Sequence, residues 1–233
     1  MTSRERVRRA LTFQFPDRAP RELWVLPGIT MFRKAEMDEL LARFPSDFTA
    51  PDFSYGPAER ARGTEAVVGT YSDAWGCVFH VAEPGVVGEV KEPPLADIRA
   101  LDHFRPPDEI LDLADFSRVN ASCAATDLFV KAGTTVRPFE RMQFLRGTEN
   151  LYYDLAEEGP ELRALIDLVH GFFVKQYTIW AGTEVDALAM MDDWGSQLSL
   201  LIDPAQWRRL FKPLYAEYVK IAHDHGKKFF MHS

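Results

Sequence analysis

The part of the chain from residue 185 onward limits the possible folds most strongly. Residues 185–191 form an apolar run that ends in Asp192 and Asp193, and residues 229–231 form a second apolar run. Between them, apolar residues recur at helical spacing. Strand, helix and strand in this order predict a βαβ unit, whose carboxyl strand ends carry side chains into a pocket.

The second of these strands is the last element of the sequence. A parallel strand that is buried on both faces is normally followed by a helix that covers it. We therefore expect a chain that is truncated at its carboxyl end.

Three more apolar or extended segments precede this unit, over residues 22–26, 47–53 and 127–133. Helical patterns separate them, and no dinucleotide-binding glycine motif follows the first. This arrangement favours a (β/α)₈ TIM-type barrel over a doubly wound sheet, with about five of the eight strands present. We expect residues 1–233 to form a single α/β domain. The helical patterns cover residues 3–13, 35–44, 95–101, 107–123, 139–145, 149–157 and 160–183.

Residues 64–92 differ in character from the rest of the chain. They contain short β-rich runs that are divided by Gly, Pro and Asp. This pattern is typical of a meander of β-hairpins, not of a crossover helix. The sequence therefore predicts a hairpin insertion between two barrel-type units.

The composition excludes several classes of protein. A net charge of −8 argues against nucleic-acid binding and against an anionic membrane surface. The amino-terminal residues lack the apolar core of a signal peptide, and no run is long enough to span a membrane. Cys77 and Cys123 lie far apart, which favours two buried free thiols. A cytoplasmic enzyme is the expectation.

Asp192 and Asp193 are the strongest candidates for catalysis. They follow a strand at its carboxyl end, where barrel enzymes place catalytic groups, and burial beside an aromatic side chain raises a carboxyl pKa. Adjacent extended residues point in opposite directions, so we expect one of the two to face the pocket. The alternative is a turn in which an Asp caps backbone N–H groups.

Three further residues are candidates for the pocket. His232 ends the last strand and could act as a general base, a hydrogen-bond donor or a metal ligand, or be an ordinary core histidine. Arg137 follows the strand predicted at 127–133 and could hold a substrate carboxylate. Trp24 could form the wall of a flat site or belong to the core. We interpret the basic run at residues 4–9 as a solvated helix face.

Several short motifs occur in an order that resembles the uroporphyrinogen decarboxylase superfamily. They are Thr2-Ser-Arg-Glu-Arg-Val7, Pro16-Asp-Arg-Ala-Pro20, Asp73-Ala-Trp-Gly-Cys77, Gly88-Glu-Val-Lys-Glu-Pro-Pro94, Asp192-Asp-Trp-Gly195 and Gly226-Lys-Lys-Phe-Phe-Met-His-Ser233. The resemblance covers the length of the chain and implies a (β/α)₈ barrel. It also implies one of two reactions, because the superfamily contains heme-pathway decarboxylases and methyltransferases that act with corrinoid proteins.

The resemblance implies roles for particular residues. Asp192 and Trp194 correspond to the acidic and aromatic segment of the family, and Asp52 lies near its catalytic aspartate. Decarboxylases carry a pair of arginines after the first strand that hold the acidic side chains of the porphyrinogen. Residues 24–33 lack that pair, so decarboxylation would lose its main cationic clamp.

In the methyltransferase branch, a His-x-Cys motif and a distant Cys hold a zinc ion that activates a thiol. His232 and Ser233 supply the first part of this motif, so His232 is a zinc ligand only if a cysteine follows at position 234. An aspartate there would indicate a zinc-free subgroup that acts on methylated amines or ethers.

These observations leave three hypotheses. The first is corrinoid-dependent methyl transfer between a small methylated substrate or thiol and a corrinoid (cobalamin) protein. The second is decarboxylation of uroporphyrinogen, a tetrapyrrole, with Arg137 as a remaining cation. The third is an inactive chain with an open barrel, whose exposed strand edge predicts aggregation or dependence on a partner. A homodimer is compatible with each of them.

Overall fold

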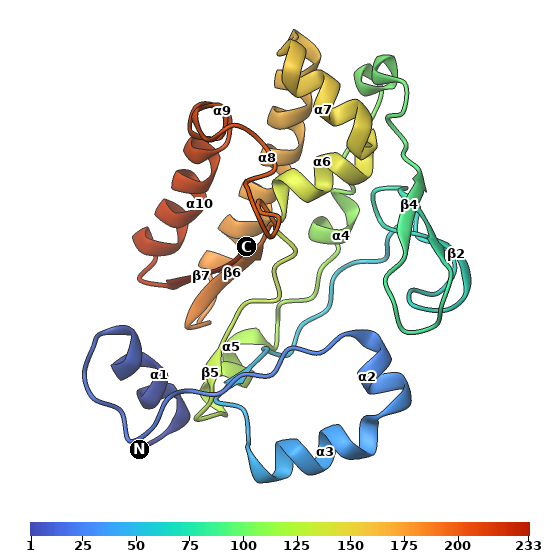
Figure 1. Cartoon of the computed structure of the whole chain (residues 1–233). Helices are drawn as coiled ribbons and strands as arrows, with labels where there is room; N and C mark the ends of the chain where they lie inside the picture. The colour runs from blue at the N-terminus through green and yellow to red at the C-terminus, as the bar shows by residue number, and fades with distance from the viewer.

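The computed structural model describes residues Met1 to Ser233 and is a mixed α/β structure (Figure 1). Its parallel strands are β1 (Phe48–Thr49), β5 (Phe129–Val130), β6 (Ala187–Met191) and β7 (Lys228–His232). No helix combines the length and the apolar character that a membrane crossing requires.

The parallel strands lie side by side in the order in which they occur along the chain. β1 pairs with β5, and β6 pairs with β7. A parallel bridge between Lys131 and Ala187 joins the two pairs, and the Ala132 N–H donates to the Ala187 carbonyl at 2.9 Å. The βαβ unit predicted from residue 185 onward is therefore confirmed.

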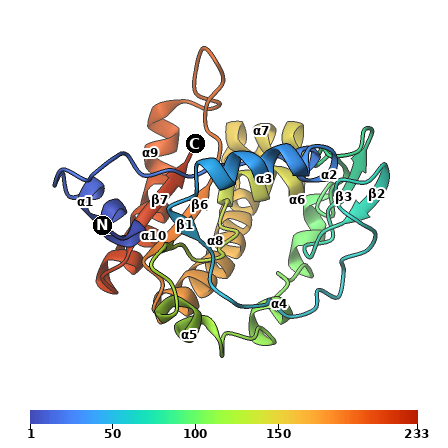
Figure 2. The same ribbon diagram turned by 90° about the horizontal axis from the view of Figure 1, so that it is seen from below.

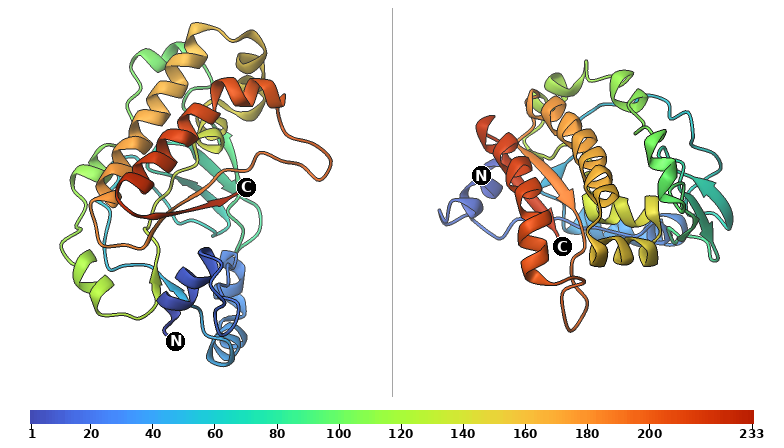
Figure 3. Two further views of the ribbon diagram at one scale, coloured as in Figure 1. Left: turned by 90° about the vertical axis from the view of Figure 1, so that its left-hand side faces the viewer. Right: turned by 90° about the horizontal axis from the view of Figure 1, so that it is seen from above.

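The helices that connect these strands cover one face of them. α8 (Pro160–Ala181) packs against β6, α10 (Lys212–Asp224) packs against β7, and the two helices pack against each other (Figure 3). Pro160 and Pro213 lie in the first turns of these helices, where a missing N–H costs no hydrogen bond. The other helices of these connections are α6 (Pro138–Arg146), α7 (Thr148–Glu157) and α9 (Pro204–Leu210).

Side chains alternate between the two faces of the parallel strands, and the two faces pack into different hydrophobic clusters. Val130, Leu188 and Phe229 belong to the main hydrophobic core beneath the helices. Their neighbours Phe129, Ala187 and Phe230 belong to a smaller cluster on the opposite face. Successive residues of a strand point to opposite faces, so neighbouring residues such as Phe129 and Val130 belong to different clusters.

The hairpin insertion is also confirmed. β2 (Gly69–Ser72), β3 (Val78–Val81) and β4 (Glu89–Glu92) form an antiparallel sheet in sequence order. This sheet lies on the side of the molecule away from β6 and β7 (Figures 1 and 2).

Some predicted elements are shorter than expected. The helix expected at 95–101 is a short 3₁₀ helix, η1 (Ile98–Asp102). The helix expected at 107–123 is two separate pieces, α4 (Glu109–Asp112) and α5 (Val119–Ala124). In contrast, α3 (Lys34–Arg43) agrees with the helix predicted at 35–44.

The strand predicted at residues 22–26 is absent, and this prediction was wrong. The segment is irregular and leads into α2 (Pro27–Phe32), and Trp24 and Leu26 are exposed. Pro20 and Pro27 flank it and remove two backbone donors that a ladder needs. The Arg21 carbonyl accepts from the Asp47 N–H at 2.8 Å, so the segment touches the start of β1 without pairing along it.

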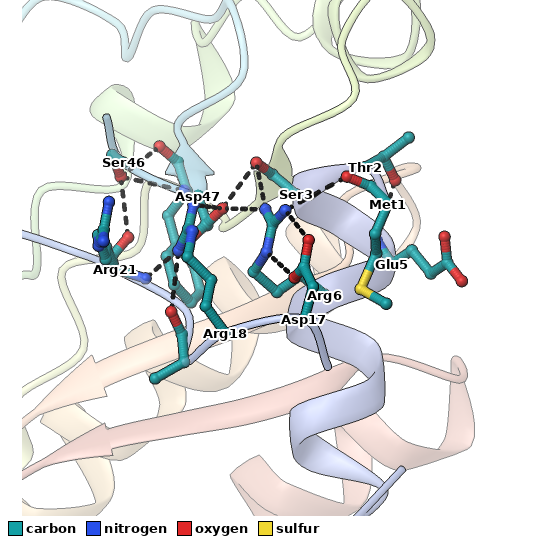
Figure 4. Close-up of polar contacts among 12 residues, drawn as sticks. Met1, Thr2, Ser3, Glu5, Arg6, Asp17, Arg18, Arg21, Ser46 and Asp47 are labelled. Carbon is teal, nitrogen blue, oxygen red and sulfur yellow. Dashed lines mark hydrogen bonds and ion pairs between the residues drawn. The ribbon is translucent and has the colours of Figure 1, made fainter. Parts of the chain in front are cut away.

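Helix α1 (Ser3–Leu11) covers the amino ends of the parallel strands (Figure 4). Arg6 lies 2.7 Å from the fully buried carboxylate of Asp47, directly before β1, and Arg18 lies 2.7 Å from its other oxygen. Burial raises the pKa of Asp47, but the donors of Arg18, Ser3, Arg6 and the Arg21 N–H together hold it well below its ordinary value.

The same helix reaches a second acidic residue at the amino end of β6. Arg4 and Arg8 lie 2.9 and 2.7 Å from the carboxylate of Asp186. The prediction that residues 4–9 form a solvated face was therefore wrong for Arg4 and Arg6, which pair with carboxylates of other elements. Arg8 is exposed, and Arg9 pairs with Glu5 on the surface of the same helix.

Candidate functional site

The acidic segment after β6 divides its two carboxylates between the interior and the surface. Asp192 is 1% exposed, whereas Asp193 is exposed. The expectation that the two would point in different directions is confirmed. Their roles must therefore differ.

The Asp192 carboxylate caps the start of a helix that is distant in the sequence. It accepts hydrogen bonds from the N–H groups of Phe139 and Glu140, each at 2.9 Å, at the beginning of α6. It also accepts a hydrogen bond from the Tyr215 hydroxyl on α10. Asp192 thus joins β6 to two helices and supplies acceptors for two of the N–H groups that a helix start leaves unpaired.

Burial raises the pKa of the Asp192 carboxyl to about 6, although Tyr215 and the two N–H groups lower it. The neighbouring aromatic side chains exclude water from this carboxyl. Trp194 is 4% exposed, stacks on Phe139 with ring centres 4.0 Å apart, and donates from Nε1 to the Tyr215 hydroxyl at 2.6 Å. Trp194 therefore supports Asp192.

The exposed partner, Asp193, lies beside His232 at the carboxyl end of β7. Asp193 Oδ1 is 3.5 Å from His232 Nε2. The Trp24 ring lies against the imidazole, with ring centres 5.2 Å apart. The structure thus brings together three of the residues predicted for the pocket, and the His232 side chain is exposed.

Lys131, which follows β5, is a member of this site that the sequence analysis missed. Its ammonium group pairs with the Glu22 carboxylate. It lies 5.3 Å from the ring centre of Trp24, 5.2 Å from Phe48 and 5.6 Å from Phe230. The side chain is 13% exposed, so the ion pair is largely shielded by aromatic rings.

A cavity of about 190 Å³ lies among these groups. Its lining includes Trp24, Lys131, Ala189, Phe230 and His232. Apolar walls with a few convergent polar groups are typical of a small-molecule site. The polar groups available there are the Lys131–Glu22 ion pair and the His232 imidazole, which lies beside Asp193.

The remaining predicted residues lie outside this cluster. Arg137 pairs with Glu140 at 2.7 Å, and its second nitrogen is 3.1 Å from the Met191 sulfur. Asp52 is exposed and pairs with Arg118 at 3.2 Å. Neither has a polar contact with His232 or Lys131.

His232 and Asp193 are the two potential metal ligands that meet at this edge. Zinc sites in proteins use three or four side-chain ligands, whereas His232 and Asp193 are only a pair. No group of three or more His, Cys, Asp and Glu side chains is placed to hold a metal ion, and Cys77 and Cys123 are both buried free thiols.

Comparisons with protein-family models, with curated protein sequences and with solved structures give no match to this chain.

Proposed function

We propose that this chain is a cytoplasmic enzyme that transfers a methyl group from a small methylated compound to a corrinoid carried by a partner protein. The proposal includes a (β/α)₈-type barrel in which β1, β5, β6 and β7 are consecutive strands. Their sequential parallel order and their helices on one face support this arrangement. A homodimer is compatible with it.

The observation that carries the proposal is the small aromatic-lined cavity at the carboxyl end of the strands. Its volume of about 190 Å³ lies below the range of about 300–1,000 Å³ that is usual for drug-sized ligands. A tetrapyrrole with eight carboxylates also needs many cations, and the lysine in this cavity is already paired with Glu22. Size and charge therefore support a small substrate over uroporphyrinogen.

His232 has the central role in the proposed reaction. The bond between the methyl carbon and its oxygen, nitrogen or sulfur atom breaks, and the methyl group leaves without the bonding electron pair. A reduced corrinoid bound to the partner protein would supply the electron pair that this carbon accepts. The heteroatom keeps the bonding pair and takes up a proton, which His232 donates while Asp193 at 3.5 Å holds the ring in place.

Trp24 and the Lys131–Glu22 pair position the substrate in this scheme. The Trp24 ring is 53% exposed and forms an apolar wall beside His232. The paired charges add no net charge to the cavity, which supports a substrate that is neutral as a whole.

The proposal is tested by two parallel incubations of the protein. One contains a reduced corrinoid protein and a panel of methylated alcohols, amines, thioethers and aryl ethers, and is followed by the absorbance of the corrinoid. The other contains uroporphyrinogen and is analysed for coproporphyrinogen. We expect methyl transfer in the first and no product in the second. Formation of coproporphyrinogen without methyl transfer would overturn the proposal.

A further inference from the structure

A second cavity lies next to the candidate site, between the loop after β6, helix α9 and the end of β7. Its volume is about 270 Å³, and Met231 lines both cavities. The other lining residues used here are Trp194, Leu200, Ile202, Trp207 and Arg208. The loop that contains Leu200 extends away from the helices (Figure 3), and Leu198 at its tip is 97% exposed.

Two residues that line this cavity, Trp207 and Arg208, carry a polar group without a partner within the protein. The Trp207 indole N–H is one of two buried side-chain polar atoms without a hydrogen bond. The Arg208 guanidinium is exposed and forms neither a hydrogen bond nor an ion pair within the protein.

The other charged groups at the start and along helix α9 are already engaged. The Asp203 carboxylate caps the helix by accepting from the Ala205 N–H at 2.7 Å. Arg209 pairs with Glu158 through both of its terminal nitrogens. Arg208 is therefore the cation of this helix that remains available to a ligand, and it lies at an apolar cavity.

From this juxtaposition we infer that the cavity binds a small apolar carboxylate, with a single ring or a short chain between Trp207 and Met231 and its carboxylate at Arg208. An apolar cavity of about 150 Å³ holds a benzene molecule, so 270 Å³ accommodates a ring and a short acidic side chain. The inference concerns a separate cavity and does not depend on methyl transfer.

The test compares phenylacetate with its neutral counterpart phenylacetamide by titration calorimetry. We expect phenylacetate to bind more tightly, by about tenfold, because a charge-assisted contact to Arg208 is available to the acid alone. In Arg208→Gln this difference disappears. Arg209→Gln is the matched control, since it removes the adjacent charge outside the cavity and should leave both affinities unchanged.

A further variant tests the location of the ligand. Leu200 is 51% exposed, so Leu200→Trp fills the mouth of the cavity without disturbing the core and should abolish binding of both compounds. Thermal melts confirm that each variant is folded. The inference is overturned if neither compound binds at its solubility limit, if Arg208→Gln and Arg209→Gln act equally, or if Leu200→Trp binds phenylacetate normally.

Discussion

Tyr215 on α10 donates a hydrogen bond to the buried carboxylate of Asp192 at the end of β6. The same carboxylate accepts from the first N–H groups of α6. One acidic side chain therefore fixes the positions of two helices relative to the strand that leads to the candidate site. Its protonation should control the stability of the fold in this region.

Replacement of this acid tests its titration. The pKa of Asp192 is about 6 in the folded protein against an ordinary value of 3.8, so the folded state prefers the protonated form. The resulting stabilisation is complete below about pH 4 and is lost as the pH rises through 6, with a size of about 3 kcal/mol. The Asp192→Asn variant has no titrating group at this position, so it lacks this pH-dependent contribution to stability. Urea unfolding should show that the wild-type advantage shrinks between about pH 4 and pH 7, whereas a constant difference would contradict the assignment.

Removal of the Tyr215 hydroxyl should move the same transition. Its hydrogen bond lowers the pKa of Asp192, so Tyr215→Phe should raise that pKa above 6. The free energy of unfolding at neutral pH should fall by about 1–3 kcal/mol, because the buried carboxylate and the Trp194 N–H both lose a partner. Tyr152→Phe is a suitable control, since it removes the hydroxyl of a partly buried tyrosine that forms no hydrogen bond with Asp192. A transition that stays at the same pH would count against the contact.

The ion pairs of the buried Asp47 should contribute more to stability than the exposed ion pair between Glu5 and Arg9 of α1. Asp47 is fully buried and faces Arg6 and Arg18, so Asp47→Asn should lower the free energy of unfolding by about 2 kcal/mol. Because the pKa of Asp47 lies below its ordinary value, its contribution is present above about pH 4 and is lost as the pH falls. The control is Glu5→Gln, which breaks an exposed pair with Arg9 and should change little. Equal melting temperatures for the two variants would contradict this view.

The Lys131–Glu22 pair predicts a strong coupling between two substitutions. Lys131→Met leaves the Glu22 carboxylate beside apolar rings and should destabilise the protein by about 1–3 kcal/mol. Adding Glu22→Gln should restore most of that loss. A double-mutant cycle in urea measures the coupling, and additive effects would show that the pair does not exist in solution.

The sequence predicted those features that depend on local patterns. The strand and helix periodicity of residues 185–232 gave β6, α10 and β7, and the Gly and Pro breaks in 64–92 gave the hairpins. The rise in the pKa of an acid beside an aromatic was also expected, and Asp192 confirms it.

The features that the sequence analysis missed depend on contacts between distant residues. The arginines of α1 read locally as a surface, because Asp47 and Asp186 are far away in the chain. Lys131 lies within the strand predicted at 127–133, and the sequence analysis assigned it no role. A single lysine that alternates with Val130 and Ala132 was the available signal, since it places the ammonium on the face that carries Phe129.

The most direct measurement for the whole account is the rate of methyl transfer to a reduced corrinoid protein by the wild type, His232→Gln and His223→Gln. His223 is an exposed histidine on α10 and serves as the matched control. We predict that His232→Gln lowers the rate by about a hundredfold or more, in line with the usual contribution of a general acid, and that His223→Gln keeps the wild-type rate. Equal rates for all three proteins, or transfer by none of them, would contradict the assignment of His232 and the proposed reaction.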